Sequence, residues 1–182
     1  PDYFAALKQN YEKYNNVKFE NVAISDKEET VTMTYIPRED IVSEKVTYRL
    51  EASPQLWKEH WAGGLGSFYV DKNNLGDPNL KQYQKKIQVQ TKTIDYLIDK
   101  YDILSYKNIV VQTDCEGHDL VILKTFPFDL LKPKMYFSEI YGKTRYAPDH
   151  PRYGKDEGLY SQQDENEAKQ IFTQNGYQVH QF

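Results

Sequence analysis

The stretch IVVQTDCEGHDLVILKTF, from Ile109 to Phe126, decides the fold of this chain. It opens with a short apolar run rich in β-branched residues, which predicts a buried parallel strand over 109–112. Polar residues follow, with a glycine at Gly117 that permits a tight turn. Residues 119–124 then predict a helix. A strand, a tight turn and a helix in this order form the repeating unit of α/β folds.

Strands and helices alternate in both directions from this stretch. Strands are predicted where β-formers cluster or apolar residues alternate, over 17–24, 30–36, 45–50, 87–90, 134–140 and 177–182. Helices are predicted over 1–15, in a short stretch opening at Ser53, over 94–101 and over 162–175. The strand over 30–36 is expected to form a hairpin with the strand before it. The whole pattern predicts a mixed α/β fold.

Capping residues mark the ends of two of these helices. Thr91 or Thr93 can accept a hydrogen bond from the first N–H groups of the helix over 94–101, and Ser161 can do so for the helix over 162–175. Gly176 follows the second helix at the position where a left-handed residue commonly ends it.

Composition excludes several classes of function. The 182 residues carry a net charge of -4 and no basic stripe, which excludes a nucleic-acid partner. No apolar run reaches the length of a membrane span and no signal-peptide pattern occurs, so we expect a cytoplasmic protein without a membrane partner. The single cysteine, Cys115, excludes a disulfide framework and a cysteine-rich zinc site, and the scattered histidines predict no other metal site.

The stretch 109–126 resembles the FkbM family of S-adenosylmethionine-dependent methyltransferases. The family pattern is a hydrophobic strand, an Asp, a Glu-Gly pair, an acidic residue and a helix ending in Leu-Lys. These positions are Asp114, 116–117, Asp119 and 123–124 in this chain. Four further stretches are similar to the family and follow in family order: 1–33, 91–103, 133–142 and 175–182.

The resemblance implies a Rossmann-like class I methyltransferase sheet with helices on both faces. The family opens with a glycine-rich turn that holds the methionine part of the cofactor, and no such motif occurs in these 182 residues. We therefore expect a single domain over 1–182 that lacks its first strand–helix–strand unit and transfers no methyl group by itself. Residues 57–81 are expected to be a loop insertion. An exposed sheet edge would favour a homo-oligomer.

Three polar residues directly follow the strand over 109–112. Ligands of open α/β sheets bind beyond the carboxyl ends of the strands, so Asp114, Glu116 and His118 are the predicted catalytic residues. Asp114 would orient the acceptor or lie near the cationic sulfonium of the cofactor, and Glu116 would orient the substrate. His118 has the intrinsic pKa best suited to a general base. The alternative for Asp114 and Glu116 is that they merely cap the following helix.

The resemblance also implies a cofactor site. The adenine of S-adenosylmethionine would lie against Ala23, Ile24 and Ser25, where the third strand of the family ends, and Asp114 would contact the same cofactor. The alternative is that these three residues simply lead from a strand into the turn that begins at Asp26.

The acceptor is expected to be a small molecule or a carbohydrate. Glu139 ends another predicted strand, and Trp61, Tyr69 and Tyr141 could stack against a ring near the same edge. The alternatives are a surface ion pair for Glu139 and simple packing for the aromatic residues. The function predicted from the sequence is O-methylation of a hydroxyl group. The competing hypothesis is a non-catalytic binding domain of the same fold.

Overall fold

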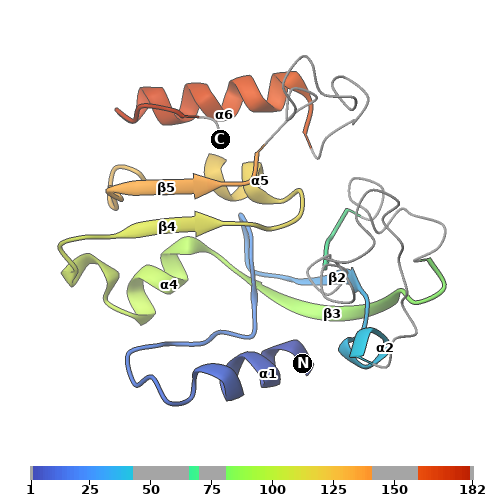
Figure 1. Cartoon of the computed structure of the whole chain (residues 1–182). Coiled ribbons are helices and arrows are strands. Elements are labelled where there is room, and N and C mark those ends of the chain that lie inside the picture. The colour runs from blue at the N-terminus through green and yellow to red at the C-terminus, as the bar shows by residue number, and fades with distance from the viewer. Residues whose placement is uncertain (1, 43–65, 70–80, 141–159, 181–182) are drawn as a thin grey trace, which may run out of the picture.

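The computed structural model describes residues 2–42, 66–69, 81–140 and 160–180 (Figure 1). Before the middle of the chain the elements are α1 (Asp2–Tyr11), β1 (Ala23–Ile24), β2 (Thr30–Tyr35), α2 (Arg38–Val42) and β3 (Lys85–Lys92). They are followed by α4 (Ile94–Lys100), the 3-10 turn η4 (Ile103–Ser105), β4 (Val110–Thr113), α5 (Asp119–Lys124), β5 (Met135–Ser138) and α6 (Gln162–Gln174). Among the described residues, no helix has the length and apolar composition that a membrane span requires.

The strands form two small sheets. In the first sheet β3 lies between β1 and β2; β1 runs parallel to β3, and β2 runs antiparallel to it from the pair Thr30–Gln90 onward. In the second sheet β4 and β5 run parallel, with Val110 opposite Met135. The mixed α/β class predicted from the sequence is therefore confirmed.

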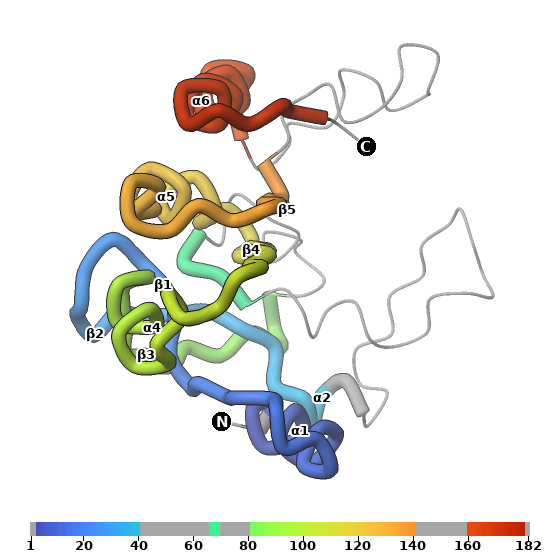
Figure 2. The backbone as a smooth tube through the Cα atoms, turned by 90° about the vertical axis from the view of Figure 1, so that its left-hand side faces the viewer, coloured from blue at the N-terminus to red at the C-terminus, as the bar shows by residue number. Residues whose placement is uncertain are grey.

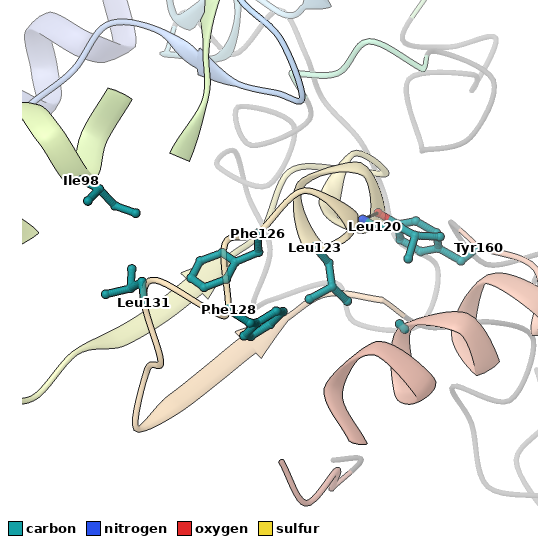
Figure 3. Packing of buried hydrophobic residues seen from close by; sticks show 8 residues of the cluster. Ile98, Leu120, Leu123, Phe126, Phe128, Leu131 and Tyr160 are labelled. Carbon is teal, nitrogen blue, oxygen red and sulfur yellow. Dashed lines mark hydrogen bonds between the residues drawn. The ribbon is translucent and has the colours of Figure 1, made fainter. Parts of the chain in front are cut away.

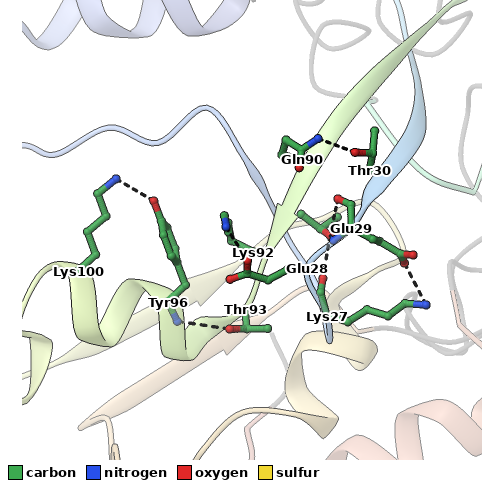
Figure 4. Close-up of polar contacts among 10 residues, drawn as sticks. Lys27, Glu28, Glu29, Thr30, Gln90, Lys92, Thr93, Tyr96 and Lys100 are labelled. Atoms are coloured by element: carbon green, nitrogen blue, oxygen red, sulfur yellow. Dashed lines mark hydrogen bonds and ion pairs between the residues drawn. The ribbon is translucent and has the colours of Figure 1, made fainter.

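The predicted hairpin between 17–24 and 30–36 is wrong, because both segments pair with β3 instead. Thr91 of β3 is only 1% exposed, and its hydroxyl donates to the Lys27 carbonyl at 2.7 Å and accepts the Glu29 N–H at 2.8 Å. These bonds attach the turn between β1 and β2 to β3, so β1 and β2 lie on opposite sides of β3. Figure 4 shows the polar contacts between this turn and β3, together with those at the start of α4.

Local signals located the ends of α4 and α6, whereas α1 ends at Tyr11, short of the helix predicted over 1–15. Thr93 accepts the Tyr96 N–H and caps α4, while Ser161 and Asp164 form a reciprocal capping box at the start of α6. Gly176 has a φ of +81° and follows α6, as expected of a left-handed terminal residue. The strand predicted over 177–182 is not formed in the described part, 177–180. The strand predicted over 45–50 and the helix opening at Ser53 lie outside the described residues.

The main core lies between the β4–β5 sheet and the helices α4, α5 and α6 (Figures 2 and 3). Its buried members are Ile98, Leu120, Leu123, Phe126, Phe128, Leu131, Tyr160 and Ala168. Val111 and Tyr136 pack against them from the inward face of the sheet. The opposite face carries Val110, which is 59% exposed. The prediction that the strand over 109–112 is buried on both faces is therefore wrong for the described part of the chain. There, helices cover only one face of the β4–β5 sheet.

We expect the substitution Thr91→Val to destabilise the chain by about 1–3 kcal/mol, because it keeps the shape but leaves the Glu29 N–H and Lys27 carbonyl without their partner. Urea unfolding measures the change. Thr30→Val, on an exposed position of the neighbouring strand, is the matched control and should cost less than about 0.5 kcal/mol. Equal losses in the two variants would contradict this role of Thr91.

Candidate functional site

The turn between β4 and α5 reverses the chain in two left-handed residues. Glu116 has a φ of +47° and Gly117 a φ of +100°. Glycine adopts such a φ without strain, whereas Glu116 is a non-glycine residue held in a rarely populated conformation. A side chain at Gly117 would also meet the ring of Tyr69 at 3.5 Å. The backbone is therefore strained at a residue of the predicted site.

Asp119, the last acidic residue of the turn motif, fixes the start of α5. It is 0% exposed, and its carboxylate accepts the N–H of Cys115 at 3.1 Å and the hydroxyl of Tyr160 at 3.3 Å. The same hydroxyl accepts the backbone N–H of Asp119 at 2.8 Å. Burial and the charge of Asp119 raise the pKa of Tyr160. The role of Asp119 is to hold the turn against the segment that leads into α6.

Three carboxylates meet where β4 and β5 end. The register pairs Thr113 with Ser138, so Asp114 and Glu139 follow side by side at the carboxyl ends of two adjacent parallel strands. Together with Glu116 they form the carboxylate cluster, in which one oxygen of each residue lies within 4.8 Å of the others. The sequence predicted each residue at this edge, and the structure brings all three together.

Within the carboxylate cluster, Glu139 holds its proton more tightly than an isolated carboxylate does. Burial raises the pKa of Glu139 to about 7, helped by its hydrogen bond to Asp114 and by the charges of Asp114 and Glu116. Like charges at this separation favour a retained proton or a bound cation. Chemically, the carboxylate cluster can accept hydrogen bonds from hydroxyl groups, stabilise a positive centre, or take up a proton near neutral pH. Carboxylate oxygens are also the ligands that hard divalent cations prefer.

His118 is buried and both of its ring nitrogens are engaged. It is 7% exposed, with Nε2 3.0 Å from Ser25 Oγ and Nδ1 3.0 Å from the Tyr69 hydroxyl. Burial lowers the pKa of His118, against the opposing charges of Asp26 and Asp119. His118 is also the N-cap residue of α5, but its side chain makes no capping bond. The histidine could take a proton from a substrate only after one of its hydrogen bonds opened.

A short segment distant in sequence covers this turn. Ser67 pairs with Thr34 at the end of β2 through two backbone hydrogen bonds of 2.9 and 3.0 Å. Its side chain donates to the Glu116 carbonyl at 2.8 Å. The Phe68 ring meets the His118 ring edge-on at 5.0 Å between centroids, and Tyr69 stacks on His118 at 5.7 Å. Sequence reasoning missed Ser67 and Phe68, because nothing near them in the chain indicates this contact.

The residues predicted to hold the adenine lie at the end of β1. Ala23 and Ile24 are half-buried, and Ser25 is buried with its N–H donating to the Lys92 carbonyl at 2.9 Å. The Ser25 hydroxyl donates to Asp26 at 2.9 Å and also contacts His118. Ser25 therefore joins the predicted adenine site to the β4–α5 turn. The predicted acceptor residues Trp61 and Tyr141 lie outside the described residues.

Comparison with known families decides the class of the domain. The profile of the methyltransferase FkbM domain matches residues 1–179. The chain belongs to the FkbM methyltransferase family. Its FkbM domain thus spans both sheets, and the carboxylate cluster lies inside it. Comparison with curated proteins and with solved structures gives no match.

We expect Asp114→Asn to lower the pKa of Glu139 from about 7 toward its ordinary value of 4.5, because the substitution removes the nearest negative charge. NMR titration of the labelled Glu139 carboxyl carbon measures the shift. Asp129→Asn, at an exposed position between α5 and β5, is the control and should leave the pKa of Glu139 unchanged. A pKa of Glu139 that stays near 7 in Asp114→Asn would show that burial alone raises it.

The raised pKa of Glu139 also predicts a pH dependence of stability. The folded protein binds this proton more tightly than the unfolded chain, so its contribution is fully present below about pH 4.5 and is lost as pH rises through 7. Glu139→Gln removes the ionisation. Relative to the wild type, it should gain on the order of 1 kcal/mol between pH 5 and 8, allowing for solvent screening of a partly exposed group.

Urea unfolding at several pH values tests this dependence. Glu167→Gln, on α6 in an ion pair with Lys124 that is exposed to solvent, is the control and should show no comparable gain over the same pH range. A variant Glu139→Gln whose stability follows the wild type in parallel from pH 5 to 8 would refute the prediction.

Proposed function

We propose that the chain is an S-adenosylmethionine-dependent O-methyltransferase domain that acts on a hydroxyl group of a small molecule or glycan. The observation that carries the proposal is the carboxylate cluster at the carboxyl ends of two parallel strands inside an FkbM domain. This edge is where α/β sheets of the Rossmann-like class bind their ligands. We assign the domain to that class, with a sheet of class I methyltransferase type.

The carboxylate cluster fits the charge of the proposed cofactor. When bound, S-adenosylmethionine supplies a methyl group on a positively charged sulfonium. Burial first, and then the neighbouring carboxylates, raise the pKa of Glu139, and a positive centre would offset the negative charges of the cluster. Asp114, the exposed member, would hold the cationic part, and the end of β1 at Ala23, Ile24 and Ser25 would hold the adenine.

Glu139 is the residue best suited to receive the proton that the acceptor hydroxyl loses. A general base works best when its pKa lies near the working pH, and the pKa of Glu139 is about 7. Asp114 and Glu116 would orient the acceptor by accepting its hydrogen bonds. Trp61 and Tyr141 are proposed to contact the same acceptor. His118 stays a candidate base only if its hydrogen bond to Ser25 or Tyr69 opens.

We expect Asp114→Asn to weaken binding of S-adenosylmethionine about tenfold, equivalent to about 1.4 kcal/mol. S-adenosylhomocysteine lacks the positive charge of the sulfonium, so the substitution should change its affinity less than about twofold. Isothermal titration of the full-length protein with both ligands measures the difference, and transfer of a labelled methyl group to a panel of sugars and small alcohols tests turnover. Asp129→Asn is again the control.

The results separate two candidate functions. Binding followed by turnover supports the enzyme. Binding of a carbohydrate or small molecule without methyl transfer would favour a non-catalytic binding domain of the same family. If S-adenosylmethionine does not bind to the full-length protein at millimolar concentration, the proposed function is wrong.

A further inference from the structure

The segment Gly66–Tyr69, here called the clamp, joins three parts of the fold. Its backbone pairs with Thr34 at the end of β2 through hydrogen bonds in both directions. Its side chains contact the β4–α5 turn, 49 residues away in sequence. Through His118 it also reaches the end of β1 at Ser25. The clamp is therefore placed to hold the turn relative to both β1 and β2.

The hydroxyl of Ser67 forms a hydrogen bond with Glu116, the strained residue of the turn. Ser67 is 3% exposed; its hydroxyl accepts the N–H of Tyr69 at 2.9 Å and donates to the carbonyl of Glu116 at 2.8 Å. A left-handed conformation costs a non-glycine residue on the order of 1 kcal/mol and persists only where surrounding contacts hold it. A buried hydrogen bond of this kind contributes a comparable amount. Ser67 thus offsets the strain at Glu116.

The hydrogen bonds that link Asp26, Ser25, His118 and Tyr69 fit one assignment of donors and acceptors. The Ser25 hydroxyl donates to a carboxylate oxygen of Asp26. The Ser25 oxygen then accepts from Nε2–H of His118, which leaves Nδ1 as an acceptor for the hydroxyl of Tyr69. This assignment satisfies these three bonds and makes His118 the neutral Nε2–H tautomer. Ser25 therefore selects the tautomer, and Tyr69 holds the ring in place by donating to Nδ1.

We propose that Ser67 and Tyr69 are positioning residues that act through Glu116 and His118 to place the Glu116 carboxylate in the carboxylate cluster. The inference rests on the proposed function, because it assigns the clamp a part in arranging the groups that would meet the acceptor. The two residues hold the turn at two points: Ser67 at Glu116, and Tyr69 at His118. His118 serves in this arrangement as a fixed link and not as the base.

The first test removes single hydroxyl groups and keeps the packing. Tyr69→Phe keeps the ring on His118 but removes the donor to Nδ1, so in nitrogen NMR of the labelled imidazole the Nδ1 signal should move to that of an acceptor without a hydrogen bond. Ser67→Ala removes the bond to Glu116, so the backbone coupling constant that reports φ of Glu116 should depart from its left-handed value. Ser67→Thr keeps a hydroxyl and should retain that value. Tyr96→Phe removes a surface hydroxyl bonded to Lys100 and is the control.

The second test reads catalysis in the full-length protein. Tyr69→Phe and Ser67→Ala should each lower kcat about tenfold with little change in KM for S-adenosylmethionine, as expected when reacting groups are misplaced and cofactor binding is intact. Ser67→Thr should restore most of kcat. Tyr96→Phe should leave kcat unchanged. Urea unfolding of each variant ensures that the comparison is made between folded proteins.

The outcomes separate this inference from the proposed function. Unchanged NMR parameters in both Tyr69→Phe and Ser67→Ala overturn the positioning role, whatever the activity. Changed NMR parameters with unchanged kcat also overturn it. If the wild type transfers no methyl group, the proposed function fails, while the NMR data still decide whether the clamp holds Glu116 and His118.

Discussion

The parallel pairing of β4 with β5 is the constraint on which the candidate site depends. Because both strands run in the same direction, their carboxyl ends meet, and the next residue of each strand is an acid, Asp114 and Glu139. Burial of Glu139 and the nearby Asp114 together raise the pKa of Glu139. The chemistry of the site therefore follows from the strand direction and register, and the aromatic core beneath the sheet holds that register in place.

The turn after β4 adds the third carboxylate at the cost of backbone strain. Gly117 accepts a left-handed φ freely, whereas Glu116 does not. Polar contacts from three separate segments hold this turn: the clamp at Glu116, the end of β1 at His118, and the segment that leads into α6 at Asp119. A site built in this way depends on the whole domain, because no single element supplies both the carboxylates and the contacts that hold them.

Features decided by neighbours in sequence could be predicted, and features decided by distant contacts could not. The caps at Thr93 and Ser161 involve residues within one helical turn, and the left-handed Gly176 follows directly from its position. The pairing of β2 with β3 depends on Thr91 binding a turn more than 60 residues earlier, which no local pattern reveals. The apolar run of β4 predicted burial on both faces, because periodicity alone does not tell how many faces helices cover.

The same distinction applies to the candidate site, and it changes which residue should act as the base. Intrinsic pKa alone favours His118, since histidine titrates near neutral pH. In the fold, however, both His118 nitrogens are bonded and burial lowers its pKa. Freeing one nitrogen would cost a buried hydrogen bond, about 1 kcal/mol or more. Glu139 lies in the carboxylate cluster, where its environment raises its pKa to about 7. A carboxylate therefore titrates near neutral pH at this site, as a histidine ordinarily would. For the proposed methyl transfer we therefore place the base on the carboxylate cluster, and His118 in the proposed role of holding the turn beside it.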